Sequence, residues 1–185
     1  MKPFEDYYCH FVQTENDIHK AYHDTIYGFP ASSDNELFKR LVLEINQAGL
    51  SWTLILKKRS NFELVYDNFD IDTVANYGEA DRERLRNDPR IIRNRLKINA
   101  AIHNAQVIQQ LQKEYGSFKN WLDSQFPKTI EAWVKLFKKT FKFTGGEITK
   151  EFLMGTGYIK GAHHPDCPIY EKVLQCQPKW LEQES

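Results

Sequence analysis

The sequence predicts an all-α fold, and three observations lead to that prediction. Apolar residues recur at helical rather than strand spacing along most of the 185 residues. Helix start and stop signals bracket several of these stretches. The only strand-like alternation, at 140–144, is equally compatible with a loop that buries two phenylalanine rings. Hydrophobic residues make up 41% of the chain and charged residues 27%, which is typical of a globular protein. We expect a single domain over residues 1–185.

The best marked helix begins near residue 33. Ser33-Asp34-Asn35-Glu36 has the form of a capping box, and Leu37, Leu41 and Ile45 follow at the spacing of one helix face. Gly49 is placed to end this helix. Further helices are expected at about 53–66, 71–77, 80–86, 93–114, 117–126, 129–139 and 147–154.

Charge and composition narrow the class of protein. Lys plus Arg and Asp plus Glu are both 25, so the formal net charge is zero. This excludes a nonspecific coat for nucleic acid, but not an enzyme whose cations gather on one face. Glu5 and Asp6 stand where a signal peptide would be apolar, and no stretch approaches the roughly 20 apolar residues of a membrane span. We expect a cytoplasmic protein that does not bind membranes.

Cysteine and histidine residues near both ends form a candidate metal site. Cys9 and His23 lie near the start, and His163 and Cys167 lie near the end with His-x3-Cys spacing. Two thiolates and two imidazoles suit a closed tetrahedral zinc site, which would fasten the ends of the chain. The spacing alone is also compatible with a buried cysteine and hydrogen-bonded histidines. The rival ligands are His10, His164 and Cys176.

A carboxylate stands on the apolar face of the first marked helix. Glu44 lies three residues after Leu41 and seven after Leu37, and burying it is costly unless donors face it. Gln47 and an aromatic residue, Trp52, follow. A buried acceptor among aromatic faces suits a flat heterocycle with an N–H donor. The alternative is that Glu44 pairs with an Arg or Lys and that the rings belong to the core.

Cations gather near residue 90. Residues 88–97 form a turn that enters a helix, and they include Arg90, Arg93, Arg95 and Lys97. Backbone N–H groups at a helix start, with cations nearby, suit a phosphate. A second basic run occupies residues 57–59. The alternative for both is a solvated helix face.

Together these motifs resemble the 3-methyladenine DNA glycosylase I family. The resemblance rests on Tyr22-His23-Asp24, Glu44, Gln47-Ala48-Gly49-Leu50-Ser51-Trp52 and Leu56-Lys57-Lys58-Arg59. It continues through Ile91-Ile92-Arg93, Lys97-Ile98, Asn104-Ala105, Phe141-Lys142-Phe143 and the His163/Cys167 pair. The motifs occur in the family's order and at near-family spacing over roughly residues 8–170.

The resemblance implies a helix-hairpin-helix fold with the hairpin at residues 88–97, and zinc held by Cys9, His23, His163 and Cys167. It implies that Glu44 is the active-site residue that reads the edge of a flipped base, and that Leu50 is a wedge into the base stack. The other implied roles are as follows: Tyr22, Trp52, Phe11, Tyr27 and Gln47 contact the base, and Arg93 and Lys97 contact DNA. Arg90 and Leu96 occupy hairpin positions that are often glycine in the family.

The implied activity is hydrolysis of the N-glycosidic bond of 3-methyladenine in alkylated double-stranded DNA, by a monomer without lyase activity. Such an enzyme must flip the damaged nucleotide out of the duplex. Two other functions stay open on the sequence: a non-enzymatic reader of alkylated DNA, and a zinc-stapled module that binds protein. The sequence contains no phosphate-binding glycine loop, GxSxG or HExxH motif, so phosphoryl transfer, serine hydrolysis and metalloprotease chemistry lack support.

Overall fold

The computed structural model describes residues 3–14 and 17–183, and in this part of the chain all regular secondary structure is helical, without a strand. It divides into two compact units: a terminal unit, built from residues 1–31 and 150–185, and a central unit, residues 32–149. The prediction of an all-α fold is therefore confirmed for the described residues. None of their helices is long and apolar enough to cross a membrane.

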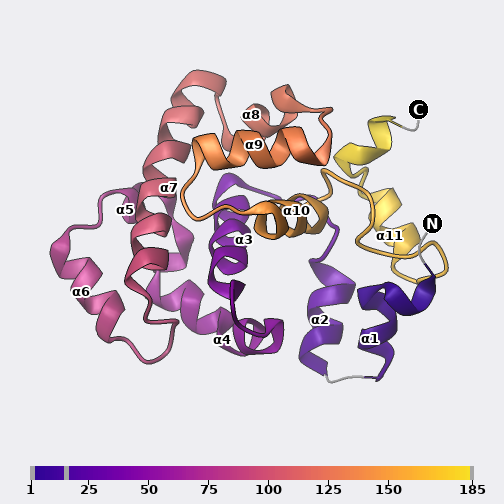
Figure 1. Cartoon of the computed structure of the whole chain (residues 1–185), viewed down its shortest axis with the longest axis horizontal. Coiled ribbons are helices and arrows are strands. Elements are labelled where there is room, and N and C mark those ends of the chain that lie inside the picture. The colour runs from indigo at the N-terminus through magenta and orange to yellow at the C-terminus, as the bar shows by residue number, and fades with distance from the viewer. Residues whose placement is uncertain (1–2, 15–16, 184–185) are drawn as a thin grey trace. The chain divides into compact units, whose positions relative to one another are not determined.

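The terminal unit combines both ends of the chain. Its helices are α1 (Tyr8–Thr14), α2 (Asp17–Thr25) and α11 (Tyr170–Gln175). Two 3-10 helices, η1 (Phe4–Asp6) and η3 (Lys179–Gln183), complete it, and α10 (Gly146–Gly155) begins in the central unit and ends here. The helices α1 and α2 lie side by side as an antiparallel pair (Figure 1). We did not expect helices at α1, α2 or α11, because all three are short and carry few periodic apolar residues.

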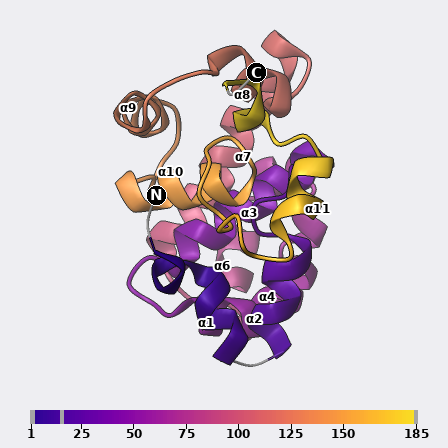
Figure 2. The same cartoon turned by 90° about the vertical axis from the view of Figure 1, so that its right-hand side faces the viewer.

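The central unit contains the larger apolar core. Its helices are α3 (Asp34–Gln47), α4 (Trp52–Val65), α5 (Ile71–Ala75), α6 (Glu79–Asn87), α7 (Arg95–Tyr115), α8 (Phe118–Gln125) and α9 (Ile130–Thr140), with η2 (Asp67–Phe69) between α4 and α5. The long α7 packs against α5, α6 and α8. Helix α9 runs across the direction of α7 and is seen end-on in Figure 2. The expected helices all occur, with shifted ends.

Local signals set the limits of α3. The Ser33 hydroxyl accepts a hydrogen bond from the backbone N–H of Glu36 at 3.2 Å, which is one half of a capping box. The Glu36 carboxylate pairs instead with Lys39 and Arg40. Gly49 follows the helix with φ +77°, a conformation that residues with a Cβ rarely adopt. The chain therefore turns sharply between α3 and α4.

The candidate strand at residues 140–144 is wrong. Thr140 ends α9, and residues 141–145 form a turn before α10. Phe141 is buried, but Phe143 is 40% exposed and has φ +63°. The alternation was misleading because one ring enters the core and the other is displayed at the surface, so the loop alternative is correct for only one ring.

Candidate functional site

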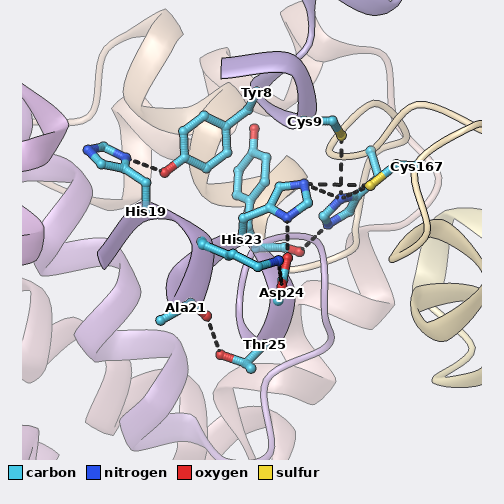
Figure 3. A network of polar contacts seen from close by, with 11 residues as sticks. Tyr8, Cys9, His19, Ala21, His23, Asp24, Thr25 and Cys167 are labelled. Carbon is cyan, nitrogen blue, oxygen red and sulfur yellow. Dashed lines mark hydrogen bonds and ion pairs between the residues drawn. The ribbon is translucent and has the colours of Figure 1, made fainter. Parts of the chain in front are cut away.

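Four candidate ligands meet inside the terminal unit. Cys9 comes from α1, His23 from α2, and His163 and Cys167 from the segment between α10 and α11, and all four are buried. One ligand atom from each lies within 4.8 Å of the others. Figure 3 shows Cys9, His23 and Cys167 facing one another. The structure thus brings together Cys9 and Cys167, which are 158 positions apart in the sequence.

The distances suit a tetrahedral ion. Cys9 Sγ and Cys167 Sγ each lie 3.7 Å from His163 Nδ1. Cys167 Sγ is also 3.7 Å from His23 Nε2, and the two imidazole nitrogens are 3.1 Å apart. Ligand atoms that share a tetrahedral ion at about 2.0–2.3 Å are separated by about 3.3–3.8 Å. The three sulfur–nitrogen distances fall in this range, and the nitrogen–nitrogen distance is slightly shorter. This group of side chains can therefore hold one metal ion without a rearrangement of the helices.

Each imidazole is oriented by its other ring nitrogen. His23 Nδ1 lies 2.7 Å from Asp24 Oδ1, and His163 Nε2 lies 2.7 Å from the Tyr27 carbonyl oxygen. Because a carbonyl oxygen only accepts, His163 Nε2 carries the proton and Nδ1 keeps its lone pair for a metal. Such outer contacts fix the tautomer of histidine ligands. Burial also lowers the pKa of His163 to about 4, so its imidazole is neutral near pH 7.

The rival ligands lie elsewhere. Cys176 is exposed. The Nδ1 atom of buried His164 accepts from the Asp166 N–H at 3.1 Å. His10 is half-buried and is absent from the four-residue cluster. Phe4 and Tyr7 place their ring edges against His164, so these side chains form a wall beside the cluster.

Aromatic rings fill the neighbouring part of the terminal unit. Tyr22 and Tyr27 are buried with ring centroids 5.7 Å apart, whereas Phe11 is 41% exposed. The Tyr27 hydroxyl donates to Glu151 Oε2 at 3.1 Å. Three of the aromatic residues predicted to contact a base, Phe11, Tyr22 and Tyr27, therefore lie in the terminal unit.

Tyr8 lies at the centre of this cluster, and the sequence analysis missed it. Its ring contacts Phe11, Tyr22 and Tyr27, and its hydroxyl lies 2.5 Å from Nδ1 of buried His19. Figure 3 shows the Tyr8 and His19 side chains pointing toward each other. Tyr8 directly precedes Cys9, and this position beside a candidate ligand is the one signal that could have drawn attention to it.

The other predicted base-contacting residues belong to the central unit. Glu44 is buried on α3 at 6% exposure. Gln47 is the last residue of α3 and Trp52 the first of α4, and both are half-buried. Leu50 is 38% exposed on the turn between them, and its N–H donates to the Gln47 carbonyl at 2.7 Å. The end of α3 thus combines a buried carboxylate with an exposed apolar side chain.

The structure places Lys97 differently from the sequence-based expectation. Its side chain is 4% exposed, and its ammonium donates to the carbonyls of Asn46 at 2.9 Å and Ala48 at 2.7 Å. Burial lowers the pKa of Lys97. These carbonyls lie at the negative end of the α3 dipole, where a cation is stabilising. The expectation that Lys97 faces DNA is corrected: Lys97 caps α3.

Side chains already occupy part of the predicted phosphate seat between α6 and α7. The Arg90 N–H donates to Asp88 Oδ1 at 2.9 Å, and the N–H groups of Leu96 and Lys97 donate to Asn94 Oδ1. The Arg90 guanidinium also pairs with Asp88. Arg93 remains exposed on this connection, so of the two DNA contacts predicted here it is the accessible one.

The fold and the cluster define an all-helical protein with a buried site that could hold a metal. Comparisons with known proteins identify its family. The methyladenine glycosylase family matches residues 12–135. DNA-3-methyladenine glycosylase 1 of Escherichia coli K12 is 33% identical, over 88% of this chain and 96% of that protein. DNA-3-methyladenine glycosylase of Haemophilus influenzae is 29% identical, over 83% and 93%.

A solved structure agrees with these relatives. The structure of 3-methyladenine DNA glycosylase I from Staphylococcus aureus, which addresses 3-methyladenine recognition, superposes with a TM-score of 0.77 at 30% identity. The match covers 91% of this chain and 97% of that one. The chain belongs to the methyladenine glycosylase family, as its motifs predicted.

Proposed function

We propose that this protein is a DNA repair glycosylase that releases 3-methyladenine from alkylated double-stranded DNA by hydrolysis of the N-glycosidic bond. The observation that carries the proposal is the buried carboxylate of Glu44 on α3, less than two turns before the exposed Leu50. Family membership supplies the reaction class. A buried acceptor next to an exposed wedge suits an enzyme that extrudes a base and then reads its edge.

The residues predicted to contact the base, together with Leu50, have the following roles in this proposal. Glu44 accepts a hydrogen bond from the exocyclic amine of the base, and its negative charge favours a cationic methylated base over neutral adenine. Tyr22 and Trp52 stack on the faces of the base, and Phe11 and Tyr27 complete the aromatic wall. Leu50 enters the base stack, and Gln47 contacts the base.

The bond-breaking step needs little activation. Methylation at N3 makes adenine a cation, so it leaves as a neutral base when the C1′–N9 bond breaks. Water adds its oxygen to C1′ and gives up a proton, and the product is an abasic site. Glu44 acts by holding the base in place, and no step requires a lysine nucleophile or a lyase reaction.

Zinc is the metal that best suits the cluster in the terminal unit. Thiolates and imidazoles are its usual ligands in structural sites, and four protein ligands leave no position for water. Zinc would therefore stabilise the fold and supply no chemistry to the reaction. Cys9, His23, His163 and Cys167 would hold it.

The proposal includes the setting expected from the sequence: a monomer in the cytoplasm, with residues 1–185 acting as one domain. It also includes the helix-hairpin-helix assignment. The support for a hairpin is that α6 and α7 are joined by a short connection, residues 88–94, and pack against each other.

A base-release assay tests the activity directly. Duplex DNA carrying radiolabelled methyl groups on purines is incubated with the protein, and released bases are separated by chromatography. We expect release of 3-methyladenine and accumulation of abasic sites. Filter binding to alkylated and undamaged duplex is measured in parallel. Binding to alkylated duplex without release would indicate a non-enzymatic reader, and failure of both would favour a protein-binding module.

A further inference from the structure

Phe143 occupies a position that the fold alone does not explain. Its φ is +63° and its side chain is 40% exposed. A bulky residue with positive φ is a backbone outlier, and such strain persists only where the surroundings impose it. A residue that is 40% exposed gains less from burial than a core aromatic residue does to offset that strain. Residues with strained backbones gather at functional sites.

Buried polar contacts hold this turn in place. The side chain of Asn104, on α7, is fully buried and bonds the backbone of Lys142 twice: Nδ2 donates to the Lys142 carbonyl at 3.1 Å, and Oδ1 accepts from its N–H at 2.8 Å. The Thr144 hydroxyl donates to the Phe137 carbonyl at 3.0 Å. Phe143 therefore lies between two anchored residues, and their hydrogen bonds hold its backbone in the turn.

Lys97 connects the Phe143 turn to the turn that carries Leu50. Its ammonium lies 5.9 Å from the centre of the Phe143 ring and 2.7 Å from the Ala48 carbonyl. The cation thus contacts both turns, so the turn that carries Leu50 and the turn that carries Phe143 lie on either side of Lys97 in the central unit.

A groove separates the two turns. It measures about 440 Å³ and is lined by residues 47–49 on one side and 145–148 on the other. A Cβ added to Gly49, Gly145 or Gly146 would meet no atom within 4 Å. Packing therefore does not require glycine at 145 and 146, whose φ values are not positive. Glycines without side chains allow another chain to approach the backbone closely. Because the groove adjoins the Leu50 turn, we take a strand of DNA as its occupant.

We propose that Phe143 is a second DNA-contacting residue, which stacks against the duplex next to the nucleotide displaced by Leu50. The inference rests on the proposed function, because it takes the Leu50 turn as part of the DNA face. Aromatic side chains that stack on unpaired bases contribute about 1–3 kcal/mol per base, equivalent to about five- to 150-fold in binding. The strained turn would keep the ring ready for that contact.

Three variants test this role: Phe143→Ala, Phe143→Gly and, as a matched control, Leu64→Ala, which removes an exposed apolar side chain from α4. We expect both Phe143 variants to lose about tenfold or more in kcat/KM for base release from duplex. Binding of free 3-methyladenine should stay within about twofold, and Leu64→Ala should match wild type. Glycine tolerates positive φ, so Phe143→Gly should melt within a few degrees of wild type.

The outcomes separate this inference from the proposed function. If wild type releases no base, the proposed function fails, and filter binding of Phe143→Gly to duplex still tests the contact. Wild-type base release by Phe143→Gly would overturn the inference, as would a large loss of its melting temperature, which would make the ring a structural element. A change in sedimentation without a change in base release would also overturn it, by making Phe143 a contact between copies of the chain.

Discussion

The terminal and central units are stabilised by different means. In the terminal unit, short helices from both ends of the chain meet around a thiol and imidazole cluster. In the central unit, longer helices bury large apolar side chains such as Phe38, Phe62 and Trp133. Its irregular segments are held by buried polar side chains, Lys97 and Asn104. In our proposal, zinc at this cluster adds stability to the small unit, whose length limits the size of its apolar core.

This difference assigns separate tasks to the two units in our proposal. The central unit carries the carboxylate, the wedge and the strained aromatic turn, and hydrogen bonds of Lys97 and Asn104 hold the end of α3 and the Phe143 turn. The terminal unit carries an aromatic cluster positioned by helices that the cluster of ligands fastens. We therefore expect substitutions in the two units to separate stability from recognition.

The largest effect should follow from loss of a metal ligand. Cys9→Ala leaves three ligands, so zinc binding should weaken and the melting temperature should fall by about 10 °C or more. Metal analysis of protein purified without chelator should give one zinc per wild-type chain and much less for the variant. Cys176→Ala, which changes an exposed thiol, is the control and should match wild type. A wild-type chain that binds well under one equivalent would contradict the zinc assignment.

The next effect concerns Glu44. Glu44→Gln keeps the shape of the side chain but removes the charge, so affinity for free 3-methyladenine should fall by roughly ten- to a hundredfold. Calorimetric titration measures that loss, and thermal melting of the same variant gives the control. If Glu44 served mainly as a partner for a buried cation, melting would fall and ligand affinity would not. That pattern would rule out base reading.

Substitution of Lys97 should have a smaller effect, on both the stability of the fold and the rate of base release. Lys97→Met keeps much of the volume but leaves the Asn46 and Ala48 carbonyls without their donor, so the free energy of unfolding should fall by about 2 kcal/mol. Base release should slow as well, because the Leu50 turn loses a support. Denaturant unfolding measures the first quantity. The matched control is Lys113→Met, an exposed residue near the other end of α7. Equal stability of the two variants would contradict the capping role.

The smallest effect should be the loss of DNA affinity that follows substitution of Arg93, the exposed cation between α6 and α7. Arg93→Glu should weaken binding to every duplex sequence by a few fold and reduce the slope of log affinity against log salt by about one. Lys113→Glu changes the charge equally, but on α7 and far from the connection, and should change neither quantity. If the two variants behaved alike, the DNA face would lie away from residues 88–97.

The fold was largely predictable from the sequence because long apolar periodicities, as in α3 and α7, are decided locally. The α1 and α2 helices were missed because tertiary contacts stabilise them more than their own pattern does. The ligand set was recognised through residue types and family motifs, although spacing alone left rivals open. Lys97 was misassigned because a charge pattern does not tell an exposed cation from one that caps a neighbouring helix. Phe143 was misread for a similar reason, since its strained turn depends on Asn104, 39 positions earlier in the sequence.

The arrangement of the terminal unit has a consequence for synthesis on the ribosome. Cys9 and His23 are made first, but their partners His163 and Cys167 follow only after the whole central unit, residues 32–149, has been translated. The central unit can therefore begin to fold while the two early ligands wait without a complete site. If the cluster binds zinc as proposed, metal capture is a late event in maturation, because it requires residues from both segments of the terminal unit.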